Sequence, residues 1–270
     1  MTSTAHNPWI IMTQPNHQAR LRLFCFSYAG GTASNYRVWQ GRFPAEVEIC
    51  AVQLPGRENR LMDPLFTHMT PLITSLASAI RPYLDTPFVF FGHSMGALVS
   101  FELTRQLRRE QAELPLHLFV SAHRAPHLPD PDPPIHDLPS MKFREELHRL
   151  NGTPSSVLEN AELMHLMEPI VRADFSVCET YSYQDEPPLQ CPISAFGGLQ
   201  DPDISQEQLQ GWKQQTRRLF KRTMFEGDHF YLHNQRDALL QHIAQDLTPI
   251  LNHLSRVPYL YQKRGGRIGS

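Results

Sequence analysis

Residues 88–96 read FVFFGHSMG, and this stretch decides the fold. Its first four residues are continuously apolar, which is typical of a strand buried on both faces of a parallel sheet. Its last five residues form a G-x-S-x-G motif, after which residues 96–109 show helical periodicity. Between a strand and a helix, this motif exposes the serine oxygen at a sharp turn, and the glycines relieve crowding around it. Because an ordinary glycine-rich turn does not require this placement, we interpret Ser94 as a nucleophile.

Further apolar runs on both sides of this stretch alternate with helical patterns. Strands are expected at residues 21–27, 47–54, 116–122, 192–197 and 219–226, and helices at residues 70–84 and 236–254. This alternation predicts an α/β domain with a mostly parallel central sheet flanked by helices.

The middle of the chain interrupts the alternation. Six of the 23 prolines lie in residues 125–139, and helical patterns follow at 141–150 and 155–181 with no strand between them. We therefore expect a single domain over residues 1–255 that carries a helical insertion at about 124–185. The Gly- and Arg-rich tail within residues 256–270 is expected to be disordered.

The composition excludes several classes of protein. With 270 residues, 41% of them hydrophobic, and a net charge of −2, the chain can form a core and lacks the basic stripe of a nucleic-acid binder. The four cysteines show no metal-ligand spacing, and three of them lie in apolar runs that predict burial. No signal peptide or membrane-length apolar run is evident. We expect a cytoplasmic monomer with no nucleic-acid or membrane partner.

A serine nucleophile needs a base and an acid, which follow it in the order Asp then His in this architecture. His229 comes directly after the strand expected at 219–226, through a Gly227-Asp228 turn, and His233 is the alternative. The acid should end the preceding strand, where Asp201 is nearer than the alternative, Asp203. Asp228 adjoins His229 in sequence and is expected to serve the turn.

The oxyanion of an acyl-transfer intermediate needs two backbone N–H groups. One is expected from Met95, which follows the nucleophile, and the second from the loop after an early strand. The glycine-rich loop at residues 27–31 is that loop, with Ala29 as the donor. This chemistry requires no metal and no cofactor.

Six strings together resemble type II thioesterases, the stand-alone α/β-hydrolases that accompany nonribosomal peptide and polyketide synthases. They are FSYAGG (26–31), VQLPGRENR (52–60), GHSMG (92–96), VRADF (171–175), FGGLQD (196–201) and GDHF (227–230). The resemblance implies hydrolysis of acyl groups misloaded on the phosphopantetheine arm of carrier proteins, with acyl or peptidyl carrier domains as partners. It also implies Ser94 as nucleophile, His229 as base, Asp201 as acid, and a lid formed by the insertion.

Two alternative functions remain open at this point. The first is a product-releasing or medium-chain acyl thioesterase, or a carboxylesterase. The second is a catalytically silent protein that binds carriers.

Several lid and loop residues have structural or functional roles that the sequence suggests. We expect Arg172 and Asp174 to form a pair that anchors the lid. Arg57 and Arg60 could meet phosphate or an acidic carrier surface, or stabilise their loop. An apolar stripe could pack the lid or line an acyl chamber; it comprises Leu158, Leu163, Leu166, Met167, Ile170 and Val171.

Overall fold

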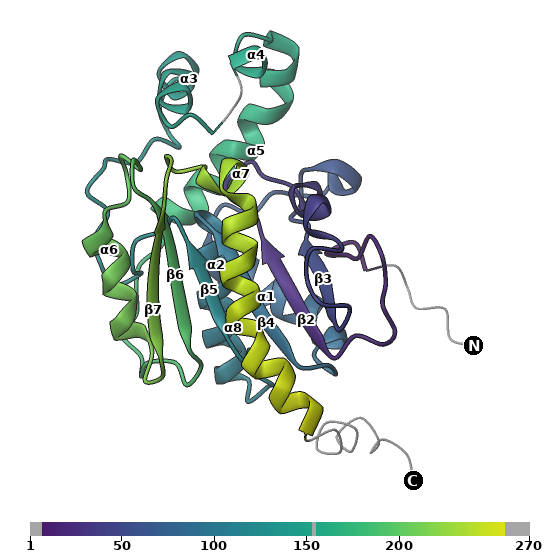
Figure 1. Ribbon diagram of the computed structural model, residues 1–270. Coiled ribbons are helices and arrows are strands. Elements are labelled where there is room, and N and C mark those ends of the chain that lie inside the picture. The colour runs from purple at the N-terminus through teal and green to yellow at the C-terminus, as the bar shows by residue number, and fades with distance from the viewer. Residues whose placement is uncertain (1–6, 153–154, 257–270) are drawn as a thin grey trace.

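The computed structural model describes residues 7–152 and 155–256, and a seven-stranded sheet forms their centre (Figure 1). The strand order is β1-β3-β2-β4-β5-β6-β7, with β1 antiparallel to β3 and every other pair parallel. The strands are β1 (Ile10–Ile11), β2 (Leu21–Phe26), β3 (Val47–Val52), β4 (Phe88–His93), β5 (Leu118–Ser121), β6 (Ile193–Gly198) and β7 (Phe220–Phe225). The parallel strands place their carboxyl ends along one edge, where the loops that carry the candidate site residues begin.

Helices cover both faces of the sheet. In Figure 1, α8 (Arg236–Arg256) lies in front of the sheet, and α1 (Met69–Ile80) and α2 (Met95–Arg109) lie behind it. Shorter helices join the strands: η1 (Ala33–Trp39), η2 (Glu58–Arg60), η3 (Arg81–Tyr83), α6 (Gln206–Gln210), η4 (Gly211–Gln215) and α7 (Tyr231–Asn234). The predicted mostly parallel sheet between helical layers is confirmed.

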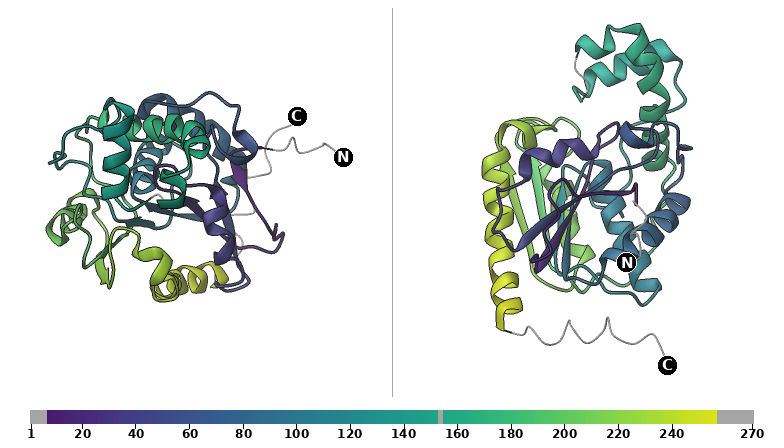
Figure 2. Two further views of the ribbon diagram at one scale, coloured as in Figure 1. Left: turned by 90° about the horizontal axis from the view of Figure 1, so that it is seen from above. Right: turned by 90° about the vertical axis from the view of Figure 1, so that its right-hand side faces the viewer.

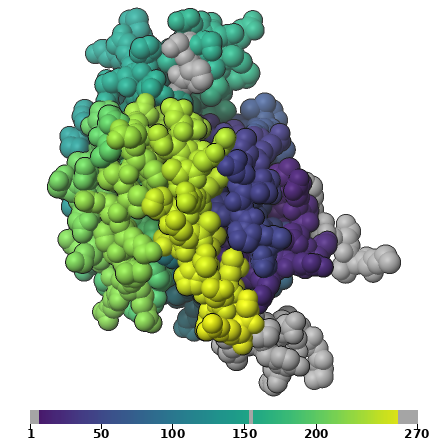
Figure 3. Space-filling model, in the orientation of Figure 1, coloured from purple at the N-terminus to yellow at the C-terminus, as the bar shows by residue number. Residues whose placement is uncertain are grey.

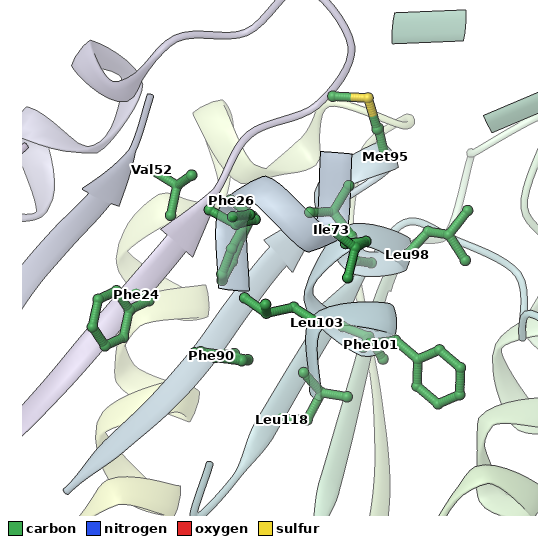
Figure 4. Close-up of a cluster of buried hydrophobic side chains, with 14 of the residues drawn as sticks. Phe24, Phe26, Val52, Ile73, Phe90, Met95, Leu98, Phe101, Leu103 and Leu118 are labelled. Carbon is green, nitrogen blue, oxygen red and sulfur yellow. The ribbon is translucent and has the colours of Figure 1, made fainter. Parts of the chain in front are cut away.

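Each face of the sheet has its own hydrophobic core because successive side chains of a strand point to opposite sides. Phe24 and Phe90 face α1 and α2 and meet edge to face, with 5.8 Å between ring centroids (Figure 4). Leu23 and Phe91, one residue away on the same strands, are buried in the opposite core beneath α8. Burial on both faces is the reason that these strands read as unbroken apolar runs.

The insertion between β5 and β6 contains α3 (Ser140–Arg149), α4 (Ser155–Leu158) and α5 (Ala161–Glu179). These helices stand above the carboxyl edge of the sheet (Figures 1 and 2) and form a distinct lobe on the molecular surface (Figure 3). The helical pattern expected over 155–181 is divided between two helices, α4 and α5. The Asn160 side chain accepts hydrogen bonds from the N–H groups of Glu162 and Leu163, both at 3.0 Å, so a new helix begins there.

The apolar stripe expected on this insertion is only partly packed: Leu158, Met167 and Ile170 are half-buried. Of its members, Val171 is buried, whereas Leu163 and Leu166 are 42% and 56% exposed. The small core of the lobe instead centres on Phe143 of α3 and Met164 of α5. Met164 and Val171, seven residues apart, share the inward face of α5, whereas Leu163 and Leu166 lie on another face.

Two further expectations concern the cysteines and the chain ends. Cys25, Cys50 and Cys191 are buried free thiols, as their apolar runs predicted. The tail predicted to be disordered lies, from residue 257 on, outside the described residues. Within the described parts of the chain, no helix has the length and apolar character needed to cross a membrane.

Candidate active site

Ser94 lies at the turn between β4 and α2 with φ 53° and ψ −121°. Positive φ is rare for residues other than glycine, and the surrounding structure must hold it. The Ser94 N–H donates to the carbonyl oxygen of Ser121 at 2.8 Å. A Cβ on Gly92 would lie 2.0 Å from the Gly96 oxygen, and one on Gly96 would lie 2.1 Å from the Phe26 oxygen. Both glycines of the motif are therefore required for the backbone to turn here.

Asp201 and His229 contact each other across the ends of β6 and β7. His229 Nδ1 lies 2.9 Å from Asp201 Oδ2, and the Asp201 side chain is fully buried while that of His229 is 14% exposed. The other carboxylate oxygen, Oδ1, accepts the N–H groups of Asp203 at 2.9 Å and Ile204 at 3.1 Å. Because a carboxylate is an acceptor, we assign the proton to Nδ1, which leaves Nε2 as a proton acceptor.

The alternative acid and base have other partners. Asp203 pairs with Arg149 of the lid at 3.0 Å, and His233 Nε2 lies 3.4 Å from the hydroxyl of Tyr28. Asp228 accepts the N–H of Phe230 at 2.9 Å, which is the turn role expected for it. Of the acids and bases considered from the sequence, the structure brings together Asp201 and His229.

A cavity of about 170 Å³ lies at this edge of the sheet, beneath the lid. Ser94 and His229 both line it, as do Ala29 and Met95. Much of its remaining wall is apolar and belongs to the insertion or its entry: Ile135, Leu147, Leu150, Val171 and Phe175. Of these residues only Val171 was considered from the sequence, because the register of helices in the insertion was not predictable from the apolar pattern.

The two expected N–H donors lie at the start of a helix and in a tight turn, and both residues line the cavity. Met95 is the first residue of α2, so its N–H has no acceptor within the helix and lies at the positive end of the helix dipole. Ala29 lies in a turn closed by a 2.8 Å hydrogen bond from the Gly31 N–H to the Tyr28 oxygen. Gly30, the third residue of this turn, has φ +75°, which favours glycine.

The His93 ring packs against the ring of His229, which is the packing role expected for it. Its Nδ1 lies 2.7 Å from the Ser121 hydroxyl, which in turn lies 2.6 Å from the hydroxyl of Tyr231. Burial, followed by the nearby His229 and His233, holds the pKa of His93 well below its ordinary value. His93 therefore stays neutral and places no positive charge beside His229, whose ring centroid is 5.4 Å away.

The pairing expected between Arg172 and Asp174 is wrong. Two residues apart on one helix, these side chains point in different directions. Arg172 instead pairs with Glu168 at 2.8 Å, four residues earlier on α5. Asp174 pairs with Arg57 at 2.8 Å.

Arg57 and Arg60 are both buried, at 5% and 6% exposed, which removes them from any carrier-facing surface. Arg60 stacks on the Trp9 ring at 3.9 Å and donates to the Gln53 oxygen at 3.0 Å. Of the two roles expected for these arginines, stabilisation of their loop is therefore the one supported.

The side chains of Asp201, Asp203 and His229 could in principle hold a cation, because their ligand atoms lie within 4.8 Å of one another. Both oxygens of Asp201 are already engaged, and Asp203 is paired with Arg149. The arrangement fits an oriented histidine better than a metal cage.

Comparison with known proteins agrees with this geometry. The model of the family described as thioesterase domain matches residues 21–247. A Brevibacillus parabrevis protein named linear gramicidin dehydrogenase LgrE is 46% identical over 93% of this chain and 96% of its own length. That name describes a dehydrogenase; the present sequence has no two glycines separated by one residue and so lacks the G-x-G-x-x-G motif.

Two solved structures are similar throughout. RedJ, a thioesterase from the prodiginine biosynthetic pathway of Streptomyces coelicolor, superposes with a TM-score of 0.80 at 40% identity, covering 86% of this chain and 87% of its own. YbtT, a type II thioesterase from the yersiniabactin NRPS/PKS pathway, gives a TM-score of 0.78 at 32% identity, covering 88% and 97%. The α/β-hydrolase fold is confirmed, and the chain belongs to the thioesterase family.

Proposed function

We propose that this protein is a type II thioesterase that hydrolyses acyl groups from the phosphopantetheine arm of carrier proteins in a peptide or polyketide synthase. The observation that carries the proposal is the 2.9 Å contact between Asp201 and His229 at the cavity that Ser94 also lines. The similarity to RedJ and YbtT along most of the chain supports the substrate class.

In the first half of the reaction, His229 Nε2 takes the proton of Ser94 Oγ as that oxygen bonds to the thioester carbonyl carbon. Asp201 accepts the Nδ1 hydrogen bond and stabilises the charged imidazole. The N–H groups of Met95 and Ala29 donate to the oxyanion. When the carbon–sulfur bond breaks, the thiol of the arm leaves with the proton from His229.

In the second half, His229 takes a proton from water, whose oxygen attacks the acyl-Ser94 ester. The ester bond breaks, Ser94 regains its proton, and the free acid leaves. The phosphopantetheine arm arrives and departs with the substrate, so the protein needs no cofactor of its own.

The apolar lining supplies binding for the acyl group. Leu147 and Phe175 of the lid and Met95 of the body enclose the cavity. Transfer of apolar acyl surface into this space is favourable by about 25 cal/mol per Å². The lid also keeps bulk water from the acyl-enzyme, which strengthens the electrostatic interactions around it.

The substitution Ser94→Ala tests this mechanism on a carrier protein loaded with a short acyl group. We expect kcat to fall by about 10⁴-fold or more, as when the serine of a triad is removed. The free energy of unfolding should be unchanged, because alanine is smaller than serine and fits the same space. Hydrolysis at near wild-type rate would refute the role of Ser94.

Two further measurements separate the alternatives. Equal rates on acyl-carrier protein, acyl-CoA and oxygen esters of one chain length would favour a general esterase, whereas a preference for the carrier supports our proposal. A protein that binds carriers without catalysis would fail to react with a fluorophosphonate at Ser94. Faster hydrolysis of small acyl groups than of a finished chain distinguishes editing from product release.

A further inference from the structure

A buried ion pair joins the lid to the body of the molecule. Arg57 follows β3 in the loop before η2, and Asp174 lies on α5. The guanidinium binds the carboxylate through two parallel bonds, Nη1 to Oδ2 and Nη2 to Oδ1, each 2.8 Å long. The side chains are 5% and 6% exposed. Burying two charges costs desolvation energy that their attraction need not exceed, so stability alone does not account for this pair.

Both partners hold the loop that follows β2. The Gly30 N–H donates to Asp174 Oδ2 at 2.7 Å, and Arg57 Nη1 donates to the Gly31 oxygen at 3.0 Å. Val171, one turn before Asp174 on α5, packs on the same glycine. The contact is close: a Cβ added to Gly30 would lie 3.1 Å from Val171 Cγ2. Helix α5 therefore meets this loop through a hydrogen bond and a packing contact.

The hydrogen bond to Asp174 sets the orientation of the peptide between Ala29 and Gly30. Positive φ at Gly30 is the conformation that a type II turn requires at its third residue. Rotation of this peptide would break the bond and turn the Ala29 carbonyl oxygen toward a buried carboxylate. Such an arrangement is costly where water is excluded. The bond to Asp174 thus fixes the peptide on the carboxyl side of Ala29. The Ala29 N–H belongs to the preceding peptide, which the turn bond from the Gly31 N–H to the Tyr28 oxygen ties to the same loop.

We propose that Arg57 and Asp174 are positioning residues that set the backbone of residues 29–31 for the oxyanion. Through them, the oxyanion hole is complete when α5 of the lid is seated on the loop. Neither side chain lines the catalytic cavity, so both act through the loop. The inference rests on the proposed function, which assigns the oxyanion contact to the Ala29 N–H.

The test uses two double variants that differ in one feature. Removing one partner would leave the other charge buried and unpaired, so both are replaced together. Arg57→Met with Asp174→Leu removes the charges and the acceptor for the Gly30 N–H. Arg57→Met with Asp174→Asn removes the charges but keeps a side-chain oxygen for that N–H. Ser176→Ala is the matched control, because it removes another tie of α5, the 3.0 Å bond to the Thr67 oxygen.

Three quantities are measured for each folded variant: kcat, KM for an acylated carrier protein, and affinity for phenylboronic acid. The boronate bonded to Ser94 presents an oxygen at the oxyanion position. In the Leu double variant we expect kcat and boronate affinity to fall together, on the order of 10- to 100-fold, with KM nearly constant. The Asn double variant should regain most of both, and Ser176→Ala should stay within about 2-fold of the wild type in kcat.

Two results would overturn the inference. Wild-type kcat and boronate affinity in the folded Leu variant would mean that the pair is only a structural tie. Equal losses in the two double variants would mean that the Gly30 bond is not the route. If the Leu variant does not fold, Arg57→Met with Asp174→Ser replaces it, because the serine side chain is too short to accept from the Gly30 N–H. A wild-type kcat in that variant would contradict the proposal.

The Ser94→Ala variant separates this inference from the proposed function. Hydrolysis that survives Ser94→Ala refutes the proposed function itself. Loss of hydrolysis in Ser94→Ala together with full activity in the folded Leu double variant refutes only the positioning role.

Discussion

The sheet edge and the lid meet at one cavity but are built in different ways. Ser94 directly follows β4, and Asp201 lies three residues after β6; both strands are paired on both sides within the sheet and packed between two cores. The lid has a small core of its own around Phe143, and polar contacts such as the Arg57–Asp174 pair join it to the body. In the proposed mechanism, the strands position the reacting groups, and the lid, which joins the main core through the later part of α5 around Val177, covers the substrate.

The largest expected effect tests the sheet edge. In Asp201→Asn the side chain can donate to His229 Nδ1 and so favour the wrong tautomer, which leaves Nε2 protonated and unable to act as a base. We expect kcat for acyl-carrier hydrolysis to fall by about 10⁴-fold, with little change in folding.

Asp203→Asn is the matched control, because Asp203 follows the same strand but pairs with Arg149 of the lid at 3.0 Å. An effect within about 3-fold is expected, in line with a partly exposed ion pair. A larger loss in Asp203→Asn than in Asp201→Asn would reverse our assignment of the acid.

The second prediction compares two fully buried phenylalanines, Phe90 in the sheet and Phe143 in the lid. Phe90→Ala should lower the free energy of global unfolding by about 3–5 kcal/mol, as large cavities in a core do. Phe143→Ala should lower it by less than half as much, because the cavity forms in a lobe that can open locally. Urea denaturation of both variants and the wild type measures the free energy of global unfolding.

Hydrogen exchange measures the local effect of the same substitutions. Protection in α3 and α5 should fall in Phe143→Ala while that of β4 is retained. Equal loss of protection in the strands and in the lid would mean that the two regions unfold as one unit.

The central sheet was easier to predict from the sequence than the lid. Strands such as β4 were predictable because burial on both faces produces an unbroken apolar run, and Ser94 and Asp201 come after such strands. His229 comes after β7, an edge strand with partly exposed side chains, and was found from its place in the chain order. β1 was missed because it contains only Ile10 and Ile11. On α5 the apolar residues Leu163 and Leu166 are exposed, so periodicity pointed to the wrong face.

Long-range polar pairs were beyond the sequence pattern. Asp174 pairs with Arg57, 117 residues away, and nothing in the local sequence of either residue distinguishes the other as its partner. Arg172, two residues before Asp174, was the expected partner instead. Only the three-dimensional course of the chain places α5 on the loop after β2.

The smallest expected effect arises where the chain leaves β5 for the lid. His123 is buried there, its Nδ1 donates to the Arg124 oxygen at 2.7 Å, and burial followed by the Arg124 charge lowers its pKa to about 3. As pH falls below 6.5, the unfolded chain takes up a proton that the folded protein does not, so stability present above pH 6.5 is lost progressively toward pH 3. At pH 5.5 the loss from this residue is about 1.4 kcal/mol.

His123→Gln should remove that part of the acid destabilisation while keeping a donor for the Arg124 oxygen. Urea denaturation of both proteins at pH 7.5 and pH 5.5 gives the comparison. We expect the drop in unfolding free energy to be smaller in the variant by about 1.4 kcal/mol. Identical drops would mean that His123 titrates alike in the folded and unfolded states. Burial where the chain leaves β5 would then not control the protonation of His123.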